Sequence, residues 1–123
     1  MAWIDYPEES EDPDWAELAE RVREQRGKLA NIIAVQGGNP ESVEGHMDLY
    51  MAIMYGQKGL SRFQRELIGT YVSALNDCEY CIEHHSSALR KYCDSDAVFR
   101  AVCDGRVPDE LEPADRALLS YCR

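Results

Sequence analysis

Two cysteines and a histidine are spaced to lie on one face of a single helix. In the segment 66–85, ELIGTYVSALNDCEYCIEHH, two residues separate Cys78 from Cys81, and His85 comes four residues after Cys81. At about 100° per residue, these three side chains fall within an arc of about 60°. His84 lies outside that arc, so the two neighbouring histidines are not equivalent. The spacing predicts thiol chemistry beside a base.

The position of Cys78 in its helix favours a reactive thiol. Cys78 follows Asp77 at the expected start of the helix, and we expect it in the first turn. Unpaired backbone N–H groups and the helix dipole stabilise an anion there, which lowers the pKa of a thiol. A C-x-x-C pair at a helix start is a known redox arrangement. His85, one turn beyond Cys81, could accept a thiol proton or hold a thiolate in an ion pair.

Glu66 is placed by similar arithmetic. If the helices before and after Asn76-Asp77 form an antiparallel hairpin, Glu66 lies about 16 Å up one arm and His85 about 12 Å up the other. Cys81 lies lower, on the side of His85. A carboxylate that orients a base acting on a thiol requires the order Glu66, His85, Cys81.

Apolar residues at helical spacing predict the elements that position these groups. The expected helices cover 15–35 with an interruption at Gly27, 40–55, 61–75, 78–92, 95–104 and 113–123. Ser61 and Gln64 form a capping-box pattern, and Ser95 is a capping residue for the helix that it precedes. No segment alternates in hydropathy for long enough to predict a strand. The expected fold class is all-α.

Length and composition predict a single domain after an acidic arm. The chain has 123 residues, within the usual size of one domain. Residues 1–14 are expected to form the arm, and 15–123 one helical domain. The last predicted helix reaches Arg123 without Gly, Asn or Pro to end it. We therefore expect a chain that is truncated at its C-terminus or completed by a partner subunit.

The charge and the cysteine count exclude several classes of protein. Lys and Arg number 13 against 23 Asp and Glu, a net charge of −10, which repels nucleic acid and anionic lipid surfaces. No apolar run reaches the roughly 20 residues of a membrane span, and the start has no secretion-signal pattern. Five cysteines, an odd number, favour a reducing cytoplasm.

These residues resemble the AhpD-like alkylhydroperoxidases of the carboxymuconolactone decarboxylase superfamily, and in particular the branch called peroxidase-related enzymes. The pattern that carries the resemblance is Glu66, eleven residues, then CEYCIEHH over 78–85, preceded by LSRFQRELI. The likeness runs from about Glu41 to Leu89, and more loosely to Arg123.

The resemblance implies an all-helical fold with its active site on a helical hairpin, in a homo-oligomer such as a dimer, trimer or hexamer. It also implies thiol peroxidase chemistry without metal, haem or another cofactor. By position, Cys81 would be the peroxidatic cysteine and Cys78 the proton donor and resolving thiol, and the two would close a disulfide. Glu66 and His85 would form the proton relay. The implied partners are a small hydroperoxide and an external dithiol reductant.

One residue departs from the family pattern. Well-studied members have a second histidine between the cysteines, where this chain has Tyr80. That part of the relay is either missing or replaced by the Tyr80 phenol or by His84, so both are candidate accessory residues.

Other functions remain open from the sequence. A thiol–disulfide oxidoreductase or a redox sensor needs the same low-pKa cysteine pair, and a catalytically idle helical assembly module needs no chemistry at all. A zinc site is less favoured because zinc usually takes two ligand pairs joined across a loop, whereas the close candidates here share one helix. A thioredoxin fold is disfavoured because its C-x-x-C follows a strand. Cys93, Cys103 and Cys122 are interpreted as ordinary thiols.

Overall fold

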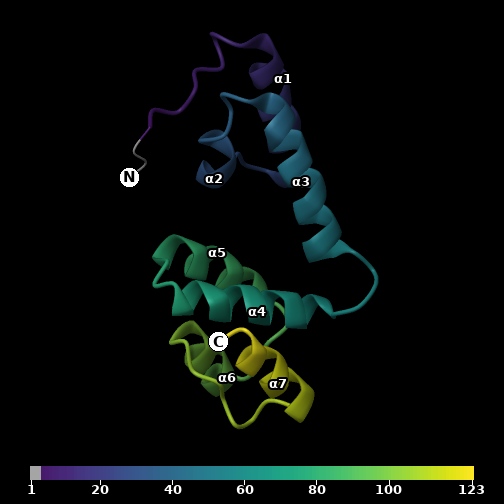
Figure 1. Cartoon of the computed structure of the whole chain (residues 1–123), viewed down its shortest axis with the longest axis vertical. Helices are drawn as coiled ribbons and strands as arrows, with labels where there is room; N and C mark the ends of the chain where they lie inside the picture. Colours follow the sequence, from purple (N-terminus) through teal and green to yellow (C-terminus); the bar gives the residue numbers. More distant parts are fainter. Residues whose placement is uncertain (1–3) are drawn as a thin grey trace. The chain divides into compact units, whose positions relative to one another are not determined.

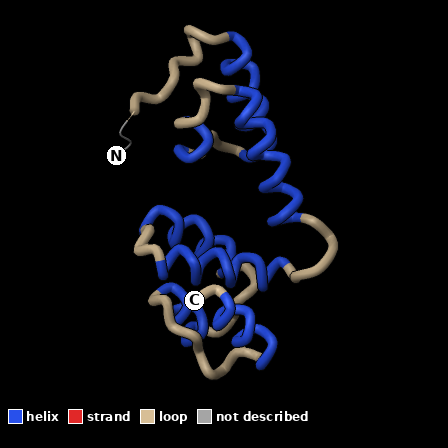
Figure 2. Tube along the Cα trace, viewed as in Figure 1, coloured by secondary structure: helices blue, strands red, loops and turns tan. Residues whose placement is uncertain are grey.

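All regular secondary structure in the described part of the chain is helical (Figures 1 and 2). The computed structural model describes residues 4–123. Its helices are α1 (Pro13–Arg26), α2 (Asn31–Ala34), α3 (Pro40–Tyr55), α4 (Arg62–Leu75), α5 (Glu79–Leu89), α6 (Asp96–Cys103) and α7 (Pro113–Tyr121). The prediction of an all-α fold is confirmed. None of these helices is long and apolar enough to cross a membrane.

Most helix boundaries follow from local capping. Ser61 caps α4, and both hydrogen bonds of the predicted capping box with Gln64 are present. Ser95 caps α6 through the backbone N–H of Val98. Gly27, at a left-handed φ of 78°, ends α1 as the sequence suggested, because glycine adopts this conformation without a steric penalty.

Several helix ends differ from the predicted ranges, by up to three residues. The first helix begins at Pro13, because the Asp12 carboxylate accepts hydrogen bonds from the N–H groups of Asp14 and Trp15. The fifth helix ends at Leu89, because Lys91 and Tyr92 donate to carbonyls three residues back, as in a tight turn. The last helix ends at Tyr121.

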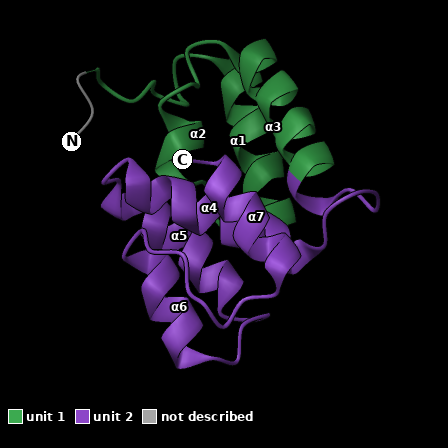
Figure 3. Ribbon diagram, turned by 60° about the horizontal axis from the view of Figure 1, so that its bottom comes forward, with its two compact units in different colours: residues 1–53 green, residues 54–123 purple. Residues whose placement is uncertain are grey.

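The chain divides into two compact units, residues 1–53 and 54–123 (Figure 3). The first contains α1, α2 and most of α3, packed around an indole. Its buried core residues are Trp15, Leu18, Ala19, Val22, Ile33 and Val43. A Cβ on Gly37 would lie 2.3 Å from the Trp15 ring, so only glycine lets the backbone approach this side chain so closely.

The second unit holds all the residues that the sequence analysis assigned to chemistry. The α4 and α5 helices lie side by side as the predicted hairpin, and α6 and α7 pack on α4 (Figure 1). Its buried core comprises Leu67, Tyr71, Leu89, Cys93, Val98, Val102, Leu111 and Leu119. Because these residues anchor both arms of the hairpin, the side chains between the arms have fixed positions.

Candidate active site

A tight turn between α4 and α5 places the cysteine pair. Asn76 ends α4, and Asp77 adopts a φ of 52°, in the left-handed region that Asp tolerates better than most residues. The N–H of Cys78 donates to the carbonyl of Ser73 at 3.1 Å. Cys78 is therefore the N-cap of α5, and our expectation that it lies in the first turn is corrected by one position. The reason is that Asp77 belongs to the turn and does not cap the helix.

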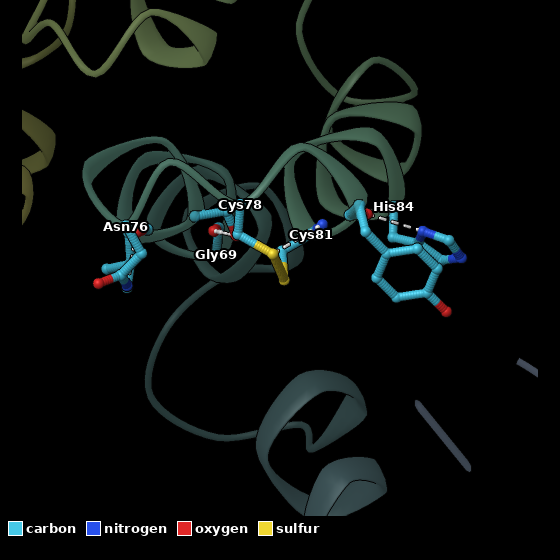
Figure 4. Close-up of a disulfide and its surroundings, with 8 residues drawn as sticks. Gly69, Asn76, Cys78, Cys81 and His84 are labelled. Atoms are coloured by element: carbon cyan, nitrogen blue, oxygen red, sulfur yellow. Dashed lines mark hydrogen bonds between the residues drawn. A yellow bond between two sulfur atoms is a disulfide. The ribbon is translucent and has the colours of Figure 1, made fainter. Parts of the chain in front are cut away.

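The two cysteines are joined in a disulfide at the amino end of α5 (Figure 4). Their Cα atoms are 5.3 Å apart, a usual separation for a disulfide. The backbone N–H of Cys81 donates to the Sγ of Cys78 at 3.3 Å, so the sulfur takes the place of a capping oxygen. Both residues are half-buried, which leaves the pair open to solvent-borne reactants.

A buried carboxylate connects the two arms of the hairpin. Glu66 is 1% exposed, and its Oε2 lies 2.8 Å from the Nδ1 of His85. Its other oxygen, Oε1, lies 2.5 Å from a guanidinium nitrogen of Arg62. A buried carboxylate is stable only when it is paired and hydrogen-bonded, and here each oxygen has a partner.

The pairing with Arg62 determines the direction of the histidine hydrogen bond. An ionised carboxylate only accepts hydrogen bonds, so His85 Nδ1–H donates to Glu66 Oε2. In the neutral imidazole, Nε2 then carries the free lone pair. The imidazole of His85 is thus held in a fixed orientation on α5, one helical turn beyond Cys81 and on the same face.

A glycine on α4 makes room for the imidazole. A Cβ built on Gly69 would lie 2.7 Å from His85 Nδ1 and 2.9 Å from its Cγ. Real Cβ atoms do not approach ring atoms so closely, so any side chain here would displace the ring. Gly69 therefore allows the two helices to approach closely where Glu66 meets His85.

Tyr80 and His84 form a separate pair on the exposed side of α5. Their ring centroids are 4.2 Å apart with the planes tilted by 37°, and His84 Nδ1 lies 2.9 Å from the Tyr80 carbonyl oxygen. Figure 4 shows His84 further along the helix than the disulfide. Of the two neighbouring histidines, His85 therefore contacts Glu66, whereas His84 contacts Tyr80.

The sequence analysis missed two residues of this site, Arg62 and Gly69. A signal existed for Arg62, because it precedes Glu66 by four residues and so lies on the same helix face. The requirement for glycine at position 69 depends on a residue 16 positions away across the hairpin, and no local pattern reveals it.

Three cysteines lie outside the pair, and within residues 4–123 no cluster of His, Cys, Asp and Glu could hold a metal ion. Cys93 is buried, and Cys103 and Cys122 are half-buried. Burial raises the pKa of the Cys103 thiol, and the nearby charge of Asp104 adds to that effect. Cys103 is therefore a less reactive thiol than an exposed one.

Comparison with known families places the chain. The carboxymuconolactone decarboxylase family matches residues 40–122, which include the whole hairpin. The chain belongs to this family. The match covers the glutamate, the cysteine pair and the histidine, so the resemblance seen in the sequence is confirmed. The family and the cysteine pair together fit a redox function. No curated protein is significantly similar to the chain.

Solved structures of the family have the same fold. A peroxidase-related protein from Ralstonia eutropha JMP134, described as an alkylhydroperoxidase AhpD core, is 25% identical with a TM-score of 0.77, over 96% of this chain and 63% of that one. A peroxidase-related protein from Silicibacter sp. TM1040 is 26% identical with a TM-score of 0.62, over 97% and 74%.

An AhpD core from Rhodospirillum rubrum ATCC 11170 matches in fold, with 23% identity and a TM-score of 0.60 over 99% of this chain and 82% of that one. The expected AhpD-like helical fold is thus confirmed. The chain spans 63% of the length of the Ralstonia protein.

Proposed function

We propose that the chain is a thiol-dependent hydroperoxide reductase. The observation that carries this proposal is the hydrogen bond between buried Glu66 and His85. His85 lies on α5, the helix whose amino end carries the Cys78–Cys81 disulfide. A redox pair alone would serve many functions, but a base oriented by a buried carboxylate is what activation of a thiol requires. The family and the peroxidase-related structures support the same reading.

In the reduced protein, His85 takes the proton of the Cys81 thiol. Its Nδ1–H is committed to Glu66, so the proton goes to Nε2, and the carboxylate stabilises the resulting imidazolium. Arg62 holds Glu66 in position by pairing with its second oxygen. The relay is therefore Glu66, His85 and Cys81, with Arg62 as a positioning residue.

The reaction then proceeds in two steps. The Cys81 thiolate attacks the distal oxygen of a hydroperoxide ROOH, the O–O bond breaks, and Cys81–SOH and RO⁻ form. RO⁻ takes the proton held on His85 and leaves as the alcohol ROH. The Cys78 thiol then condenses with Cys81–SOH, which forms the Cys78–Cys81 disulfide and releases water. That disulfide is the form seen in the structure.

An external dithiol closes the cycle. One thiolate of the dithiol attacks the Cys78–Cys81 disulfide through a mixed disulfide, and the second thiol completes the exchange. The two protons and two electrons of the dithiol restore both cysteines. We propose that the protein works in this way in a reducing compartment and as a homo-oligomer, with Tyr80 and His84 as accessory groups near the cysteines.

One contact favours a second candidate function. The N–H of Cys81 donates to the sulfur of Cys78, and after reduction this contact would stabilise a thiolate on Cys78 rather than on Cys81. A thiolate on the first cysteine of the pair suits a thiol–disulfide oxidoreductase, which exchanges disulfides with a partner protein without consuming peroxide.

Mass spectrometry of the reduced protein tests the proposal and separates it from this alternative. One equivalent of an organic hydroperoxide is added, and the intact mass and peptide map are recorded over time. Rapid loss of two hydrogens, mapped to Cys78–Cys81 and reversed by a dithiol, supports the peroxidase. If peroxide leaves the cysteine pair reduced while a small-molecule disulfide oxidises the pair rapidly, the result favours the thiol–disulfide oxidoreductase over the peroxidase. Slow oxidation spread over all five cysteines contradicts both and favours an idle module.

A further inference from the structure

A pocket of about 280 Å³ opens at the amino end of α4 and is lined in part by the loop that joins α3 to α4. Figure 1 shows where this loop lies in the chain. Its volume is close to the lower end of the range for small-molecule sites. Its lining includes Met54, Tyr55, Leu60, Arg62, Arg65 and Tyr92. All of these residues belong to the unit 54–123. The pocket therefore combines two guanidinium groups with an aromatic and aliphatic wall.

The charges in this pocket do not balance. Arg62 is paired with Glu66, so its charge is compensated. Arg65 is only 9% exposed, and its guanidinium donates to the carbonyl of Lys58 at 2.6 Å. Among residues 4–123 no carboxylate forms an ion pair with Arg65, and no Asp or Glu lines the pocket. One positive charge is thus left over in a chain whose net charge is −10.

A buried cation without a counterion is costly. A guanidinium has five N–H donors in a planar fork, and the carbonyl of Lys58 uses only part of this capacity. A ligand that supplies one negative charge and two acceptor oxygens would satisfy both needs, because guanidinium and carboxylate groups match in a bidentate pair.

We propose that this pocket binds a small organic monocarboxylate, with its carboxylate on Arg65 and its apolar body against Tyr55, Tyr92 and Leu60. The single uncompensated charge favours a monoanion over a phosphate dianion. The apolar wall favours an organic acid over an inorganic ion. Arg62 borders the pocket and also pairs with Glu66, so the pocket and the Glu66–His85 pair share one arginine. The binding itself does not depend on peroxidase activity.

The test compares benzoate with benzamide, two probes of nearly the same shape that differ in charge. Binding to the full chain is followed by NMR titration of the backbone amides. We expect saturable binding of benzoate, with shifts concentrated at residues 54–65 and at Tyr92, and binding of benzamide weaker by about tenfold or more. Equal affinity for the two probes, or benzoate shifts that lie elsewhere, would overturn the proposal. Tighter binding of inorganic phosphate than of benzoate would overturn the choice of a carboxylate.

Variants locate the anion contact. Arg65→Gln should weaken benzoate binding about tenfold, and Arg65→Lys, which keeps the charge but not the planar fork, should give an intermediate affinity. The matched control is Arg106→Gln, which removes an exposed arginine that pairs with Asp104 in the same unit, and it should bind benzoate as the parent does. An equal loss in Arg106→Gln would show a general charge effect and contradict the site. If Arg65→Gln fails to fold, Arg65→Lys and the two-probe comparison still decide the question.

Discussion

The Nδ1 of His85 lies 2.8 Å from the Oε2 of Glu66 and joins residues 19 positions apart in the sequence. The bond crosses from α5 to α4 in the interior of the hairpin, where Glu66 is shielded from water. A hydrogen bond to a buried charged group is stronger than one at the surface. The same contact thus helps to hold the two helices together and orients the imidazole, so changes to either residue should affect both packing and chemistry.

The two cysteines should respond differently to substitution. In Cys81→Ser, we expect no turnover of hydroperoxide, because the attacking thiolate is absent. In Cys78→Ser, a single oxidation of Cys81 to the sulfenic acid should occur and the cycle should then stop, because no thiol can resolve it. Peroxide consumption and intact mass measure both outcomes. Steady turnover in both single variants would contradict the mechanism. A single oxidation event seen only in the Cys81→Ser protein would show that Cys78 is the peroxidatic cysteine and Cys81 the resolving one.

Removing the charge of Glu66 should impair the relay. Glu66→Gln retains the shape but cannot stabilise an imidazolium on His85, so we expect kcat/KM to fall by about 10²-fold. Steady-state consumption of hydroperoxide gives kcat/KM, and thermal denaturation shows whether the fold is retained. The matched control is Glu83→Gln, an exposed acid on α5, for which we expect parental kinetics. A parental kcat/KM in Glu66→Gln would show that the pair is only structural.

Gly69→Ala should separate His85 from Glu66. The added methyl group would lie 2.7 Å from His85 Nδ1, so the ring must move and the hydrogen bond must break. We expect activity to fall while the disulfide still forms with an added oxidant. Gly45→Ala on α3 is the control, because nothing lies within 4 Å of its new Cβ, and it should raise stability by about 0.5–1 kcal/mol. Thermal denaturation and the NMR shifts of the His85 ring measure these effects. A parental His85 spectrum in Gly69→Ala would contradict the close packing.

Cys103 should be the slow thiol in an alkylation experiment. Its pKa is raised by burial and by the charge of Asp104, so at a given pH it holds less thiolate than an ordinary cysteine, and only the thiolate reacts. We expect iodoacetamide to label Cys103 more slowly in the folded protein than in guanidinium chloride, with a difference that shrinks as the pH rises above the raised pKa. Peptide mapping of time points gives the rates. Equal rates in the two states at neutral pH would argue against this environment.

The helices and the hairpin could be predicted because their signals are local. Apolar spacing, Gly27 and the capping residues Ser61 and Ser95 act within one or two turns of the chain. The common level of Glu66 and His85 followed from helical rise once a turn was placed at Asn76-Asp77. The position of Cys78 as N-cap was missed, since it depends on the backbone conformation of Asp77.

The sequence by itself determined that the chain is all-α, that it carries a redox-type cysteine pair with a histidine on the same face, and that it resembles the AhpD-like family. Only the tertiary structure decided which groups meet across the hairpin. It paired Arg62 with the buried carboxylate of Glu66 and required glycine at position 69. It also left Arg65, in the pocket at the amino end of α4, without a carboxylate partner among residues 4–123. Helix periodicity states which face a residue occupies, whereas burial and charge pairing depend on the opposing surface, which is distant in the sequence.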